Sequence, residues 1–210
     1  MATYRTPQEK IALVAAATKI AKEESVALEG IGEDLPFSLM AWNDSTLAAI
    51  CQLDASLNDE VPGERLIRTV EAATICRRGF DTTAFTFVTE GYCATDPAAI
   101  DSQTPLAAQF VDNHDVKECL TVTHIEAGNI YLAAIPYHYQ VGRTMAWEPM
   151  LTYEPTHAGG NHFLASMVEI LITDIREPRF IDDSEAWEDL VAEDITRWGF
   201  HIRYGLDLDE

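Results

Sequence analysis

Apolar residues recur with a helical period near the N-terminus of the chain. The stretch TPQEKIALVAAATKIAKEESVALEG opens with a capping box, in which Thr6 is the cap and Glu9 lies three residues later. Pro7 takes the first helical position, where a missing N–H does no harm. The pattern predicts a helix that begins at Pro7 and ends near Gly30, since glycine readily adopts the backbone conformation found after a helix.

Two further helices are predicted before residue 80. The first lies in NDSTLAAICQLDASLND, where Asp44 or Ser45 supplies the cap and apolar residues fall along one helical face. The second begins near Pro62 and ends at Gly79, and the two arginines in its last turn complement the helix dipole. These segments are expected to form an N-terminal helical group.

The pattern changes to two-residue alternation in the middle of the chain. Residues 82–94 are rich in aromatic and β-branched side chains, which is typical of a strand. Residues 118–140 predict two strands joined at Gly128 and Asn129. Short helical pieces are expected between these segments, and residues 142–153 are a candidate for another strand. A mostly antiparallel sheet follows from this arrangement.

The helical period returns after Asn161 and again over residues 184–198, while residues 200–206 alternate and predict a final strand. Helices, then an antiparallel meander, then helices indicate one α+β domain, with a central sheet of about four or five strands and two C-terminal helices. The domain is expected to have a helical part, a sheet-containing part, and a helical part with a terminal strand, at residues 1–80, 81–155 and 156–210.

Net charge is the most unusual property of the composition. The chain of 210 residues has 35 acidic and 14 basic residues, for a formal net charge of −21. Such a field repels nucleic acid and anionic membranes, so neither is an expected partner. Three interpretations remain: a well-solvated surface, adaptation to high salt, and mimicry of a nucleic acid that occupies a basic partner. Because the acidic residues are spread along the whole chain, the sequence favours the first.

The rest of the composition is typical of a globular protein. Apolar residues make up 47% of the chain, and no stretch approaches the roughly 20 apolar residues that a membrane span needs. The N-terminus lacks the basic-then-apolar layout of a secretory signal, so a cytoplasmic location is expected. The four cysteines are 25, 17 and 26 positions apart, which excludes a zinc ribbon, and they are expected to be reduced core side chains.

The predicted hairpin carries three side chains that could ligate a metal: His124, Glu126 and His138. A turn at Gly128 and Asn129 puts the two histidines on opposite faces of the sheet. A register shifted by one residue brings them to one face but leaves them about 20 Å apart at strand rise. Bonds to one zinc ion are only about 2 Å long, so no metal site is predicted.

Three tyrosines share the predicted face of the hairpin with His124, and they are Tyr131, Tyr137 and Tyr139. One interpretation is that the tyrosine rings pack inside the protein and only their hydroxyl groups reach the solvent-exposed edge of the packed face, since strands normally bury one face. The other is a surface that contacts a protein partner, because tyrosine is enriched at interfaces. The sequence favours the packed face and leaves the interface as a weaker candidate.

The segment THAGGNHF is the best candidate for a small-ligand site. Gly159 and Gly160 would let the backbone approach a ligand, next to a helix start that favours anions. His157 and His162 would supply charge or proton transfer, although they are five positions apart rather than the four that align two ligands on a helix. The simpler interpretation is a sharp bend capped by Asn161. No phosphate-binding or dinucleotide-binding glycine motif occurs, so no cofactor is predicted.

Without a catalytic motif, the sequence predicts a soluble, non-enzymatic binding or regulatory protein. It would contact another protein or a second copy of itself. One alternative is an enzyme that acts on a small molecule, with a pocket near residues 157–162. The other alternative is an acidic nucleic-acid mimic that blocks a basic site.

Overall fold

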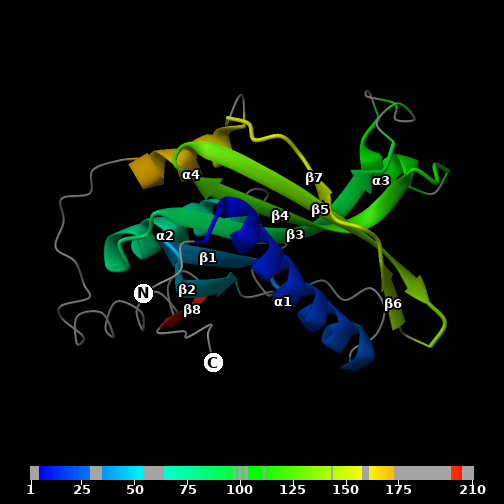
Figure 1. Cartoon of the computed structure of the whole chain (residues 1–210), viewed down its shortest axis with the longest axis horizontal. Coiled ribbons are helices and arrows are strands. Elements are labelled where there is room, and N and C mark those ends of the chain that lie inside the picture. Colours follow the sequence, from blue (N-terminus) through cyan, green and yellow to red (C-terminus); the bar gives the residue numbers. More distant parts are fainter. Residues whose placement is uncertain are drawn as a thin grey trace.

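The described part of the chain forms one eight-stranded sheet with helices on both faces (Figure 1). The computed structural model describes residues 5–28, 35–53, 64–96, 98, 101, 104–110, 112–142, 144–157, 161–172 and 200–204. Its helices are α1 (Pro7–Leu28), α2 (Glu64–Gly79), α3 (Leu106–Gln109) and α4 (His162–Ile172). Its strands are β1 (Ser38–Asn43), β2 (Thr46–Leu53), β3 (Ala84–Ala94), β4 (Val116–Glu126), β5 (Asn129–Gln140), β6 (Thr144–Trp147), β7 (Leu151–Thr152) and β8 (Phe200–Tyr204).

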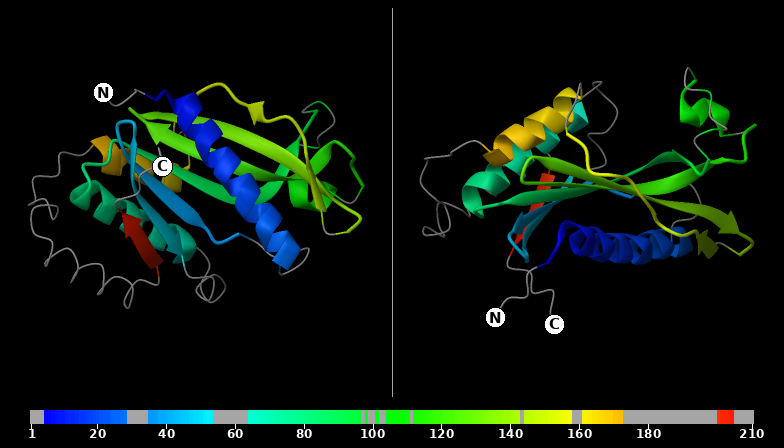
Figure 2. Two further views of the ribbon diagram at one scale, coloured as in Figure 1. Left: turned by 60° about the horizontal axis from the view of Figure 1, so that its bottom comes forward. Right: turned by 45° about the horizontal axis from the view of Figure 1, so that its top comes forward.

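The strand order is β6-β5-β4-β3-β1-β2-β8, with β7 paired to β5, and every pairing is antiparallel. This confirms the α+β class and the antiparallel sheet, although the sheet is larger than predicted. The right-hand view of Figure 2 shows α1 on one side of the sheet and α2 and α4 on the other. Each face of the sheet therefore has its own hydrophobic core, one beneath α1 and one beneath α2 and α4.

α1 begins as the sequence predicts. The backbone N–H of Thr6 donates to Glu9 Oε2 at 2.7 Å, and the N–H of Glu9 donates to Thr6 Oγ1 at 3.3 Å. Pro7 is the first helical residue. The capping box is confirmed, while the expected end at Gly30 lies outside the described residues.

The largest correction concerns the segment predicted as a second helix. Its residues 46–53 form β2, which pairs with β1 through a tight turn at Asp44, whose φ is 50°. Helices cover both faces of the sheet, so β2 is apolar on both faces: Leu47 packs in the α1 core and Cys51 in the α2 core. A short apolar run of this kind lacks alternation and cannot be told from a helix by period alone. The N-terminal helical group is therefore wrong, since a β-hairpin separates α1 from α2.

The turn between β4 and β5 lies one position earlier than predicted. Its two central residues are Ala127, with a φ of 50°, and Gly128, with a φ of 79°. Positive φ at both positions is typical of the two-residue turn that suits the twist of a hairpin. His124 consequently pairs with Tyr131. The predicted turn at Gly128 and Asn129 would instead pair His124 with Ala133, two positions further along β5. Because side chains alternate with a period of two, the predicted faces still hold.

Several other predicted elements are present in the structure. The strand at 82–94, the end of α2 at Gly79 and the final strand are confirmed as β3, α2 and β8, and residues 142–153 contain two strands, β6 and β7. Asn161 caps α4, because its Oδ1 accepts the N–H of Leu164 at 3.1 Å. The predicted helix at 184–198 lies outside the described residues. No helix in the described ranges is long and apolar enough to cross a membrane.

Candidate functional site

Two lysines on α1 are buried against the sheet and paired with glutamates. Lys10 is 0% exposed, and its Nζ lies 3.0 and 3.1 Å from the two carboxylate oxygens of Glu126 at the end of β4. Lys22 is 1% exposed, and its Nζ lies 2.9 and 2.8 Å from those of Glu90 on β3. Burying a charge is tolerated only when it is paired and hydrogen-bonded. These two ion pairs therefore fix both halves of α1 to the sheet.

A chain of hydrogen bonds leads from the core to the Lys10 ion pair. Trp42 Nε1 donates to Thr86 Oγ1 at 2.9 Å, and Thr86 Oγ1 lies 2.7 Å from His124 Nδ1. His124 Nε2 lies 3.0 Å from Glu126 Oε2. Because Thr86 accepts from the indole, its hydroxyl is free to donate to Nδ1, and Nε2–H then donates to the carboxylate. A neutral histidine satisfies every group in the chain.

Electrostatics agree with this assignment. Burial lowers the pKa of His124, and it outweighs the opposing effect of Glu126. Burial by itself would raise the pKa of Glu126, but the hydrogen bonds from His124 and Lys10 and the nearby positive charge hold that pKa below its usual range. The hydroxyl of Thr86, the imidazole of His124 and the carboxylate of Glu126 are linked by hydrogen bonds, and these are the same three kinds of group as in a catalytic triad. Thr86 and His124 are both 0% exposed, however, so a substrate could not reach them.

Glu90 is engaged in the same complete way. Besides Lys22, its carboxylate accepts the backbone N–H of Leu35 at 2.7 Å and the hydroxyl of Tyr137 at 3.1 Å. Burial and the charge of Glu90 raise the pKa of Tyr137, so this phenol stays protonated and donates. Glu90 thus joins α1, the segment before β1, and β5 at one point.

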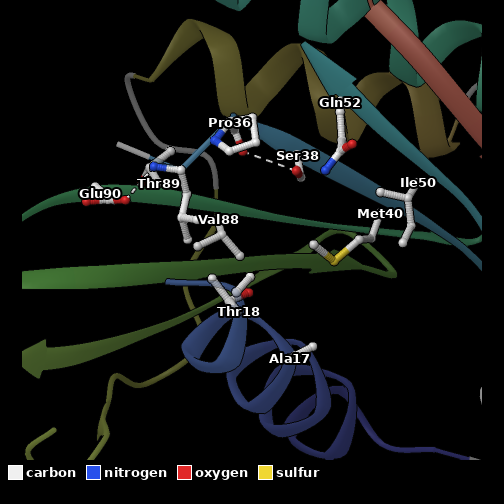
Figure 3. Close-up of a pocket in the computed structure, with 12 residues that line it drawn as sticks. Ala17, Thr18, Pro36, Ser38, Met40, Ile50, Gln52, Val88, Thr89 and Glu90 are labelled. Carbon is white, nitrogen blue, oxygen red and sulfur yellow. Dashed lines mark hydrogen bonds between the residues drawn. The ribbon is translucent and has the colours of Figure 1, made fainter. Parts of the chain in front are cut away.

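A pocket of about 220 Å³ lies beside Glu90, between α1 and strands β1, β2 and β3 (Figure 3). α1 contributes only small side chains here, Ala17, Thr18 and Ala21. The opposite wall is formed by larger apolar side chains that include Met40, Ile50 and Val88. The hollow exists because no large side chain on α1 fills the space above these strands.

The lining of this pocket is mostly apolar. Glu90 is the titratable side chain among the residues that line it. Since each oxygen of that carboxylate already accepts hydrogen bonds from Lys22 and a second donor, it has little capacity left to act as a general base. An apolar group would gain free energy by leaving water for this space.

Tyr131, Tyr137 and Tyr139 form a tyrosine strip on the same face as His124, as the sequence predicted, and α1 covers this face of the sheet. Tyr137 is 4% exposed and packs edge-on against Trp147, while Tyr131 and Tyr139 are half-buried. Much of this strip is thus covered within the chain itself. Contact of its exposed parts with a protein partner stays a prediction.

The segment around Asn161 is placed only in part. His157 and His162 are both exposed, and His157 Nδ1 lies 3.4 Å from the carbonyl oxygen of Gly128. Gly159 and Gly160 lie outside the described residues. Asn161 caps α4, as the simpler interpretation expected. A ligand at this segment stays a prediction.

The four cysteines are buried, unbridged thiols, and they lie in two pairs. Cys51 Sγ is 3.2 Å from Cys76 Sγ, between β2 and α2. Cys93 and Cys119 meet between β3 and β4, where a mutual hydrogen bond and burial raise the pKa of Cys93. The same hydrogen bond lowers the pKa of Cys119. Sequence spacing gave no sign of either pairing.

Within the described ranges, no group of three or more histidine, cysteine, aspartate or glutamate side chains is placed to hold a metal ion. His138 is exposed on the face opposite His124, as the predicted alternation requires. Comparison of the chain with family models, with curated proteins and with solved structures finds no match.

Sequence reasoning missed the ion pairs and the pocket, although one signal was present. Glu90 and Glu126 interrupt strongly apolar strands, and Lys10 and Lys22 belong to the few basic residues of an acidic chain. A charged side chain on a strand that is otherwise buried needs a partner of opposite charge. That rule predicts a basic partner, but not which lysine supplies it.

Proposed function

We propose that this chain is a non-enzymatic binding protein that contacts another protein through the pocket between α1 and strands β1–β3. An apolar side chain of the partner would occupy the pocket. The single observation that carries the proposal is the hollow left by Ala17, Thr18 and Ala21 above an apolar sheet surface. Buried apolar anchors seated in such pockets dominate the binding energy of protein interfaces.

The size of the pocket supports a side chain as its occupant. Its volume of about 220 Å³ is smaller than the roughly 300–1,000 Å³ of most drug-sized ligand sites. It is larger than the cavity of about 150 Å³ that accommodates a benzene molecule. One aromatic or branched aliphatic side chain fits this range.

The anchoring of α1 supports binding as well. Ion pairs hold α1 at Lys10 and Lys22, on either side of the residues that line the pocket. The pocket walls are therefore already in place before a partner binds. A preformed site loses less conformational entropy on binding than a flexible one. The net charge of −21 favours a basic partner, since opposite charge steers association and like charge opposes it.

The test uses a library of synthetic basic peptides, each with one aromatic or branched aliphatic residue at its centre. Binding is measured by fluorescence anisotropy for the unaltered chain and for Ala17→Trp, in which the indole fills the pocket. We expect the best peptide to bind Ala17→Trp at least about tenfold more weakly, because its anchor has lost its space. Replacing the anchor by alanine in the peptide should have an effect of similar size.

Ala16→Trp is the matched control. Ala16 is exposed and neighbours Ala17 on the same helix, but it does not line the pocket. This variant should therefore bind like the unaltered chain. If no anchor peptide binds, or if both variants weaken binding equally, the pocket is not the binding site.

A further inference from the structure

The contact between Cys51 and Cys76 is closer than ordinary packing. Their sulfur atoms are 3.2 Å apart, whereas non-bonded carbon atoms, which are smaller than sulfur, settle at about 3.5–4.0 Å. Cys51 is 2% exposed and Cys76 is 0% exposed. The two thiols thus face each other directly within the core between β2 and α2, rather than filling separate gaps.

The surrounding structure holds this contact in place. Cys51 lies in the interior of the sheet, paired with Leu39 on β1 and Ile202 on β8. The carbonyl oxygen of Cys76 accepts the N–H of Phe80 at 3.0 Å and the hydroxyl of Thr82 at 2.8 Å, which fixes the last turn of α2. The two sulfur atoms would need to approach each other by only about 1.2 Å to reach the usual length of a disulfide bond.

We propose that Cys51 and Cys76 form a disulfide bond when the chain meets hydrogen peroxide, which makes this pair a site of oxidative modification. One cysteine, as its thiolate, attacks an oxygen atom of the peroxide, and the O–O bond breaks. The departing hydroxide takes up the proton that the thiol released, so that a sulfenic acid and one water result. The other thiol attacks that sulfur and displaces the second water. In total the two thiols lose two electrons and two protons, and these reduce one peroxide to two waters.

Peroxide is the oxidant that suits this site. It is little larger than water, so small fluctuations of α2 can admit it to a buried pair, whereas a bulky disulfide reagent needs wider opening. Once the first sulfur is oxidised, the second thiol is already in contact with it. Condensation to a disulfide should therefore outpace further oxidation to the sulfinic acid.

The bond would tie α2 to β2 and close a loop between positions 51 and 76. Ile50 and Gln52, the neighbours of Cys51, line the pocket on the opposite face of β2. Oxidation would thus stiffen the strand that forms one wall of that pocket. The modification itself does not depend on the proposed binding function.

The experiment treats the full chain with hydrogen peroxide, then alkylates the remaining thiols under denaturing conditions and maps the peptides by mass spectrometry without reduction. We expect a cross-linked peptide pair that contains Cys51 and Cys76, lighter by two hydrogens than the sum of its parts. The melting temperature should rise by about 10 °C, because a loop of this length is closed in the unfolded chain.

Two variants separate this outcome from other oxidation. Cys93→Ala combined with Cys119→Ala removes the second thiol pair and should leave the cross-link and the rise in melting temperature unchanged. Cys76→Ala should abolish both effects of peroxide. The proposal is overturned if Cys51 and Cys76 are alkylated separately after treatment, if each is found as a sulfinic acid, or if only Cys93 and Cys119 become joined.

Discussion

His124 is a fully buried imidazole whose hydrogen bonds run in one direction. Trp42 donates to Thr86, Thr86 donates to His124, and His124 donates to Glu126. Each group is satisfied only while the imidazole is neutral, since a second ring proton would point at the hydroxyl hydrogen of Thr86. The buried position of this side chain therefore depends on its protonation state.

The stability of the chain should depend on pH through this residue. Burial lowers the pKa of His124 in the folded chain, whereas an unfolded histidine titrates at about 6.5. Below that pH the unfolded chain takes up the proton more readily, so the free energy of unfolding should fall as pH decreases from about 6.5 through the folded pKa. Denaturant unfolding at a series of pH values measures this slope.

His124→Gln removes the titration but keeps an acceptor and a donor side by side. Its unfolding free energy should vary less between about pH 7.5 and 5.5 than that of the unaltered chain. His138→Gln, on the exposed opposite face, should preserve the original slope. Equal slopes for the unaltered chain and His124→Gln would contradict the role given to His124.

At the residue scale, the sequence predicted only part of this hydrogen-bond network. Alternation along the hairpin correctly placed His124 and Glu126 on one face. It could not supply Lys10, which lies 116 positions from Glu126, or Thr86, which lies 38 positions from His124. Hydrogen bonds between distant segments leave no periodic trace in a sequence.

At the scale of elements, α1 is attached to the sheet by apolar packing and by two ion pairs. Ile11, Val14 and Ala15 pack in the core beneath the helix, while Lys10 and Lys22 reach carboxylates on β4 and β3. Breaking a buried pair leaves one charge without its partner, and that is more harmful than replacing both partners.

The Lys10–Glu126 pair gives a direct test of this attachment. Glu126→Gln should lower the free energy of unfolding by about 3 kcal/mol, because the Lys10 ammonium stays buried without a countercharge. Lys10→Met combined with Glu126→Gln should recover much of that loss, since no buried charge remains. Chemical denaturation of the three chains measures the differences. A double variant less stable than Glu126→Gln would show that the ion pair is not the reason.

Elements were predictable where one local signal dominated. The capping box fixed the start of α1, and the alternation of residues 82–94 identified β3. β2 was mistaken for a helix because both of its faces are apolar, and the hairpin turn was placed one residue late because a glycine can take either central position. The first error concerns tertiary surroundings that the local sequence does not encode, and the second concerns a local ambiguity between two turn positions.

At the scale of the whole molecule, the net charge of −21 is the dominant property. Like charges on one compact body repel each other, and this repulsion is weaker in the expanded unfolded chain. Salt screens the repulsion over a Debye length of about 8 Å at physiological ionic strength. Added salt should therefore favour the folded state.

We expect the melting temperature to rise as sodium chloride is added up to about 0.15 M and then to level off, as screening becomes complete. Calorimetry over a salt series measures this curve. A continued rise towards molar salt would instead support adaptation to high salt. Mimicry of a nucleic acid would reveal itself differently, by capture of a basic partner that weakens steeply with salt.

The sequence by itself determined the α+β class, the caps and ends of several helices, the strands of the central hairpin and the faces of their side chains. These depend on short-range periodicity and capping, which act over a few residues. Only the tertiary structure decided that β1 and β2 form a hairpin, that Lys10 meets Glu126, that Cys51 meets Cys76, and that a pocket remains beneath α1. The physical reason is that pairing and cavity shape depend on which distant surfaces come together, and local pattern does not specify this.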